Sequence, residues 1–189
     1  MSLPGTLTNH LLVAMPSLTD PNFREAVALI CEHSPEKGAL GIVLNKPLPM
    51  TLSQVLEQMQ LEARDAEIAS RSVLRGGPVH MDRGFVIHRA GGDWDSTHRV
   101  SDSIQVTTSR DVLAAMARGE GPGDAFIALG YAGWDAGQLE REVLDNAWLV
   151  LPVDEAIVFE MPYGERWPAV WRKLGIHNLG SISHVAGHA

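Results

Sequence analysis

Two clusters of glycine mark the places where this chain could hold a ligand. The first spans residues 76–84 and the second residues 129–140. Glycine lets a backbone turn tightly, at a cost of about 0.5–1 kcal/mol relative to alanine inside regular structure. Because both clusters carry that cost, we expect one reason for both, either close backbone packing or a ligand seat.

The first cluster surrounds a Gly-Gly-Pro turn with charged side chains. Arg75 and Arg83 could clamp an oxyanion, because the guanidinium fork matches a carboxylate or a phosphate. Asp82 lies beside Arg83 in the sequence. The alternative interpretation is therefore a salt-bridged loop in which Asp82 pairs with an arginine.

The second cluster reads as a strand, a glycine loop and a helix, with Asp135 as a possible helix cap. A helix start carries partial positive charge and can hold an anion, here near Ala136. Neither a Walker loop nor the dinucleotide pattern G-x-G-x-x-G is present. The alternative is a tight turn from strand to helix, with two aromatic side chains packed beneath it.

Together the clusters define a candidate ligand site. We predict that they lie side by side at strand ends, lined by the two aromatic residues, with one arginine reaching across. The candidate ligand-binding residues are Arg75, Gly76, Gly77, Asp82, Arg83, Gly130, Tyr131, Gly133 and Trp134.

Other reactive residues give weaker patterns. Cys31 and His33 fall on the same side of a strand, where the histidine could activate the cysteine as a thiolate. A single cysteine that ends an apolar strand is more often a buried small hydrophobe, and we expect that here. His80 or His88 could assist an arginine in an enzyme. His184 and His188 are four residues apart, but no zinc-protease motif is present, and we expect no metal, no cofactor and no catalytic residues.

Charge argues against direct binding to nucleic acid. The 189 residues carry a net charge of −8, and residues 111–160 hold ten acidic and two basic side chains. A DNA-binding protein needs a basic face to displace counterions from phosphates. We therefore expect no direct contact with nucleic acid.

The expected cellular location rests on the cysteine count and on signals that the sequence lacks. The single cysteine excludes an intrachain disulfide and fits a reducing cytosol. The first residues lack the basic start and apolar run of a signal peptide, and no run approaches the ~20 apolar residues that span a bilayer. We expect a cytoplasmic protein without membrane contact.

The elements that position these residues follow from apolar periodicity. Short apolar runs at 11–15, 26–31 and 39–44 predict buried strands, and short connections predict antiparallel pairing. Helices are expected after Thr51, after Ser109, after Asp135 and over 166–174, whereas 61–71 is interpreted as a helix end and an exposed connection. We predict an α+β fold in a single domain, residues 1–189. It is built on a large mixed, mostly antiparallel β-sheet with three to four helices and a mobile tail from about residue 178.

Several segments in order resemble one bacterial family, the YqgE/AlgH proteins. They are NHLLVAMP at 9–16, DPNF at 20–23, GIVLNKP at 41–47, GGPV at 76–79, DRGF at 82–85, LGYAGW at 129–134, GQLE at 137–140, NAWL at 146–149 and AGHA at 186–189. The resemblance implies a cytosolic α+β protein whose molecular function is unsettled. It also implies the family's label of transcriptional regulator, although no helix-turn-helix pattern is present.

Two functions follow as expectations. The first is a non-enzymatic regulatory or adaptor protein that binds a partner protein or a small anionic ligand. The alternative is an enzyme or binding protein that acts on a small anionic ligand through the two glycine-rich loops. The sequence leaves the identity of the partner and the oligomeric state open.

Overall fold

The computed structural model describes residues 3–179 of the chain. Within them the chain divides into two compact units. The first is formed by the residues up to 46 together with those from 132 onward, and the second by residues 47–131. Part of the tail for which we predicted mobility, and with it His184 and His188, lies outside the described residues.

The first unit is built on an antiparallel sheet whose strands follow the order β10-β1-β2-β3-β9. The predicted apolar runs form its buried strands, because each run is flanked by turn residues that stop it. Only the last three residues of β9 pair with β3, at 132–134. The strands are β1 (His10–Ala14), β2 (Val27–Ser34), β3 (Gly38–Val43), β9 (Phe126–Trp134) and β10 (Trp148–Pro152).

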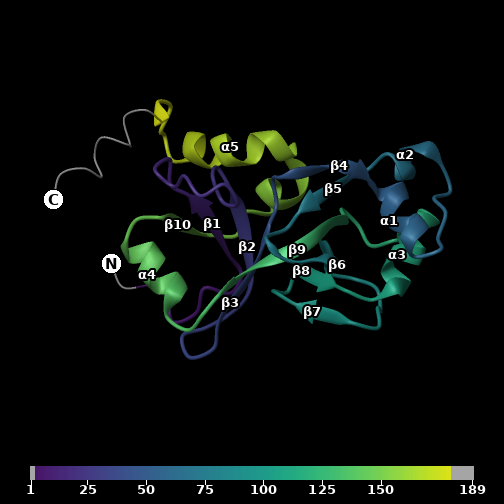
Figure 1. The fold of residues 1–189 in the computed structure, drawn as a ribbon, viewed down its shortest axis with the longest axis horizontal. Helices are drawn as coiled ribbons and strands as arrows, with labels where there is room; N and C mark the ends of the chain where they lie inside the picture. The colour runs from purple at the N-terminus through teal and green to yellow at the C-terminus, as the bar shows by residue number, and fades with distance from the viewer. Residues whose placement is uncertain (1–2, 180–189) are drawn as a thin grey trace. The chain divides into compact units, whose positions relative to one another are not determined.

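In the described part of the first unit, four helical segments accompany the sheet. They are α4 (Gln138–Leu144), a π-helix at Ala156–Glu160, a 3-10 helix at Tyr163–Glu165 and α5 (Arg166–Lys173). Figure 1 shows α5 beside β1, and the indole N–H of Trp167 donates to the carbonyl of Ala14 at 2.9 Å. The helix predicted over 166–174 is confirmed, and it ends one residue earlier, at Lys173.

In the second unit, β9 continues into a mixed sheet. Its residues 126–129 and 131 pair antiparallel with β6, which is followed in the sheet by β8 and then β7. Its residues 127–129 pair parallel with β5. The remaining strand, β4, pairs with β5. The bounds are β4 (Pro47–Thr51), β5 (Ser72–Arg75), β6 (Val79–Arg89), β7 (Thr97–Arg99) and β8 (Ile104–Thr107).

Three helices pack on this sheet, α1 (Leu52–Gln58), α2 (Ala66–Ala69) and α3 (Arg110–Ala117), and they gather on one side of the second unit (Figure 1). Thr51 and Ser109 stand at the predicted N-caps. The segment 61–71, read as a connection, contains α2, because the Asp65 carboxylate accepts the Ile68 N–H at 3.0 Å and closes one turn.

The predicted fold class is confirmed. Within residues 3–179, ten strands form one hydrogen-bonded sheet in which a single pair, β5 with β9, is parallel. Five α-helices lie in the described part, where we expected three to four. No helix within residues 3–179 combines the length and the apolar character that crossing a bilayer requires.

Candidate functional site

The two glycine clusters meet inside the second unit. The N–H of Gly76 donates to the carbonyl of Leu129 at 2.8 Å. A Cβ added at Gly130 would lie 2.6 Å from the carbonyl oxygen of Gly77, closer than real Cβ atoms approach. The clusters thus pack backbone against backbone, and glycine is required at 130 by this approach and by a left-handed φ of 76°.

Gly76 and Gly77 lie in the turn between the end of β5 and the start of β6, whereas Gly130 lies within β9, opposite a bulge of β6. Val79 pairs with Tyr131 and Gly84 with Leu129, so residues 80–83 of β6 face only Gly130 of β9. The expected sequence of strand, glycine loop and helix is wrong at this point. Gly130 bends the strand in its left-handed conformation, and pairing then resumes up to Trp134.

The bulge presents a row of exposed side chains, which we call the bulge patch: His80, Met81, Asp82 and Arg83, with Phe85 and Tyr131 beneath them. Met81 is 37% exposed, and His80 has a left-handed φ of 46°. The rings of His80 and Tyr131 lie 6.0 Å apart, and those of Tyr131 and Phe85 lie 5.9 Å apart. The guanidinium of Arg83 stands 5.8 Å from the Phe85 ring centre, so ring contacts hold the bulge at both ends.

The two arginines occupy different settings. Arg83 is exposed on the bulge, whereas Arg75 is half-buried at the end of β5, opposite Leu129. Asp82 is exposed and forms no ion pair within the described residues. The salt-bridged loop that we considered is therefore not the arrangement of this segment.

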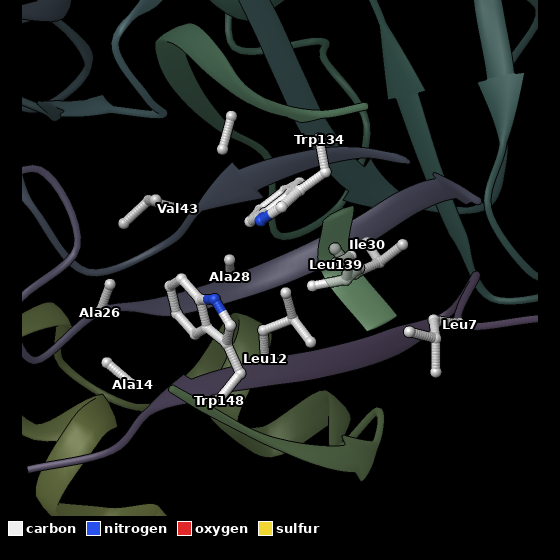
Figure 2. Close-up of a cluster of buried hydrophobic side chains, with 11 residues drawn as sticks. Leu7, Leu12, Ala14, Ala26, Ala28, Ile30, Val43, Trp134, Leu139 and Trp148 are labelled. Atoms are coloured by element: carbon white, nitrogen blue, oxygen red, sulfur yellow. The ribbon is translucent and has the colours of Figure 1, made fainter. Parts of the chain in front are cut away.

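Trp134 does not line a surface site, and our prediction for it is wrong. It belongs to the core of the first unit, where it is 5% exposed, and Figure 2 shows its indole among the other buried side chains. Its N–H and that of Trp148 both donate to Oε2 of Glu142 at 2.9 Å. Sequence reasoning missed Glu142, because nothing local distinguishes it from other acidic residues on a helix.

The start of α4 also differs from expectation. Gly137, with a φ of 74°, is the N-cap, and the Asp135 N–H donates to the Gln138 side chain at 2.9 Å. Gly133 and this helix start belong to the first unit, whereas Arg75 and Arg83 belong to the second. The anion seat that would have joined them stays a prediction.

The Cys31 thiol is buried, as predicted. Burial raises its pKa to about 12, with a smaller contribution from the Glu32 carboxylate. Nδ1 of His33 accepts the Leu7 N–H at 2.9 Å, and Nε2 donates to Glu140 at 2.6 Å. Because both imidazole nitrogens are engaged, His33 does not serve Cys31 as a base.

His88 is fully buried and enclosed by β6 and β8. Its Nδ1 donates to the Arg89 carbonyl at 2.8 Å, and its Nε2 accepts the Thr107 hydroxyl at 2.7 Å. Burial lowers its pKa. Of the two histidines that we considered beside the arginines, only His80 reaches the surface. Within residues 3–179 no group of three or more His, Cys, Asp or Glu side chains is placed to hold a metal ion.

These features define an α+β protein with a bulged mixed sheet and an exposed patch of one histidine, one aspartate and one arginine beside aromatic rings. The chain belongs to the AlgH-like family (DUF179), which it matches over residues 11–179. This confirms the resemblance seen in the sequence.

Related proteins match this chain over all or nearly all of its length. A UPF0301 protein of Thioalkalivibrio sulfidiphilus is 54% identical over 100% of both chains, and one of Stenotrophomonas maltophilia is 49% identical over 98% of this chain and 97% of its own. The solution structure of AlgH from Pseudomonas aeruginosa is 45% identical, with a TM-score of 0.79 over 100% of this chain and 99% of that one. A crystal structure of a Corynebacterium diphtheriae protein, 20% identical, shares the fold, with a TM-score of 0.72 over 96% of this chain and 93% of that one.

Proposed function

We propose that this chain is a non-enzymatic regulatory or adaptor protein of the cytoplasm that binds an acidic partner protein through the bulge patch. The observation that supports this most is the bulge itself, which holds residues 80–83 outward from the sheet. Bulges re-aim side chains, and they are common beside functional sites. Tyrosine, methionine and arginine, all present in the patch, are enriched at protein interfaces.

Backbone strain at His80 supports a binding role for this residue. A left-handed conformation costs a non-glycine residue about 1–2 kcal/mol. Glycine would avoid that cost, yet this position has an imidazole whose ring lies against Tyr131. Strain of this kind concentrates where a side chain serves a ligand and the surroundings hold it in place.

Charge selects the kind of partner. Arg83 and His80 stand on the patch, and the one carboxylate among the patch residues is that of Asp82. The chain as a whole carries a net charge of −8, whereas the patch holds one arginine, one aspartate and one histidine, so the patch is less acidic than the average surface. Complementary potentials favour a partner segment that is rich in Asp or Glu, with an apolar residue to contact Met81.

The test is binding of a defined acidic peptide, such as a Glu-rich 12-mer with one tryptophan, measured by fluorescence anisotropy. We expect Arg83→Ala to weaken binding about fivefold to tenfold, as loss of one well-placed charge does. Arg99→Ala, which removes an exposed arginine of β7, is the matched control and should leave binding unchanged. Equal weakening by both variants, or no binding by the native chain, would count against the proposal.

The second candidate is a site for a small anionic ligand. It is favoured by the fact that the two glycine clusters adjoin, and weakened because the Gly76 N–H is already bonded to Leu129. Inorganic pyrophosphate is the probe. If this candidate holds, pyrophosphate raises the midpoint of thermal unfolding of the native chain, and Arg83→Ala reduces that rise while unliganded stability stays nearly the same. No rise at millimolar pyrophosphate would favour the partner protein.

The family label of transcriptional regulator fits this proposal only through an indirect effect. We expect no sequence-selective binding to duplex DNA at physiological salt, and at most weak binding that disappears as salt is raised. Anisotropy titrations with duplexes of unrelated sequence test this expectation. Tight and selective binding to one duplex would overturn it.

A further inference from the structure

A second surface of opposite charge lies in the same unit. It is a hollow of about 380 Å³ between α1 and α2, within the range of protein binding pockets. It shares no residue with the bulge patch. The hollow is lined by Ser53, Glu57, Leu61, Glu62, Ala63, Asp65, Ala66 and Ala69.

The walls of the hollow are held in place by backbone hydrogen bonds. After α1 ends, the Leu61 N–H donates back to the carbonyl of Leu56 at 2.8 Å. Two guanidinium N–H groups of Arg110 donate to the carbonyl of Met59. The Arg64 N–H donates to the carbonyl of Ala117 at 2.8 Å, which ties the next stretch to α3. A preformed hollow of this kind loses little conformational entropy when it is filled.

The rim is acidic, and the nearby basic groups are already engaged. The Arg64 guanidinium donates to Asp65 and to the carbonyl of Arg118. The Arg110 guanidinium donates to the carbonyl of Met59. Glu57 and Glu62 are exposed and form no ion pair within residues 3–179. Two carboxylates therefore stand beside the apolar floor without an ion-pair partner among the described residues.

The floor is small and apolar. Leu61, Ala63, Ala66 and Ala69 line it, and alanine leaves room for a side chain from outside. Amphipathic helices bind such hollows with an apolar face, and their flanking charges pair with the rim. Opposite charge at the rim selects lysine or arginine.

We propose that this hollow is a docking surface for a basic amphipathic segment of a partner protein. Apolar side chains of the segment rest on the alanine floor, and its lysine or arginine side chains pair with Glu57 and Glu62. The surface is independent of the bulge patch, and the two together would let one chain hold an acidic and a basic partner.

The test uses a labelled amphipathic helical peptide made of leucine, alanine and lysine, and a second peptide in which glutamate replaces every lysine. We expect only the lysine peptide to bind. The double variant Glu57→Gln/Glu62→Gln should weaken it about fivefold to twentyfold, because two partly exposed ion pairs are lost. The control Asp93→Asn/Asp95→Asn makes the same change in net charge at two exposed carboxylates elsewhere in the unit and should bind normally.

A steric variant separates the hollow from charge alone. Ala66→Trp fills the floor from an exposed position of α2 and should weaken the lysine peptide while circular dichroism and thermal unfolding stay native-like. Equal weakening by the control pair, or unchanged binding by Ala66→Trp, would overturn the proposal. Displacement of the peptide by spermidine at equal concentration would instead identify a small polycation as the occupant. Arg83→Ala should leave this binding unchanged, so failure here does not bear on the bulge patch.

Discussion

The imidazole of His33 and the carboxylate of Glu140 are joined by a hydrogen bond of 2.6 Å that ties β2 to α4. Nδ1 of His33 accepts the Leu7 N–H, so the proton that the ring donates is on Nε2. The His33 side chain is buried and that of Glu140 is about three-quarters buried. Together with the Leu7 N–H, this pair links three segments of the first unit that are far apart in sequence.

Removing the acceptor should destabilise the first unit. We expect Glu140→Ala to lower the free energy of unfolding by about 1–3 kcal/mol, because the buried Nε2–H loses its partner. Glu140→Gln should cost less, since its amide oxygen can still accept. Urea denaturation measures both, with the exposed Glu36→Ala as control. A Glu140→Ala variant as stable as that control would contradict the expectation.

The buried His88 predicts a loss of stability in mild acid. Its pKa is lowered by burial from an ordinary value of 6.5, so below pH 6.5 the unfolded chain binds a proton that the folded chain resists. The contribution of neutral His88 is complete above pH 6.5 and is lost as the pH falls through that value toward the lower pKa of the folded state. Urea denaturation between pH 8 and pH 5 tests this.

The matched variants for this pH effect are His88→Gln and His80→Gln. We expect His88→Gln to flatten the pH dependence of the unfolding free energy, because glutamine does not titrate. His80 is exposed, so His80→Gln should keep the native slope. Identical slopes for all three proteins would assign the effect to other groups.

Gly130 should tolerate substitution far less than Gly137, which has a similar φ. In Gly130→Ala the new Cβ would meet the carbonyl of Gly77 at 2.6 Å in addition to the left-handed backbone. We expect a loss of about 2–4 kcal/mol, of which conformational strain accounts for about 1–2 kcal/mol.

Gly137→Ala is the control for that clash. Gly137 has a φ of 74°, but a Cβ there would meet nothing within 4 Å, so only the strain of about 1–2 kcal/mol is expected. Thermal or urea unfolding compares the two variants. Equal losses would show that the contact between the glycine clusters is not what demands glycine at 130.

Cys31 should be unreactive in the folded chain. Its thiol is 2% exposed with a pKa of about 12, and the reacting species is the thiolate. At pH 8 a thiol reagent should label the native protein slowly and the urea-unfolded protein at the rate of an ordinary cysteine. Rapid labelling of the native protein would revive a reactive role for this residue.

Much of the architecture was determined by local patterns in the sequence. The apolar runs of β1, β2 and β3 are short and are bounded at both ends by turn residues. This pattern predicts strands. Thr51 and Ser109 mark helix starts because their residue type and the apolar spacing after them agree. These signals depend on neighbours a few residues away, which a sequence displays directly.

Tertiary structure decided the candidate site. Gly130 looks like a loop residue until Gly77 is seen opposite it, and the pairing of Val79 with Tyr131 is what turns residues 80–83 into a bulge. Glu142 acquires its role only when Trp134 and Trp148 aim their indole N–H groups at it. Strand register and shared acceptors are set by contacts between distant segments, whose energies depend on packing that no local pattern encodes.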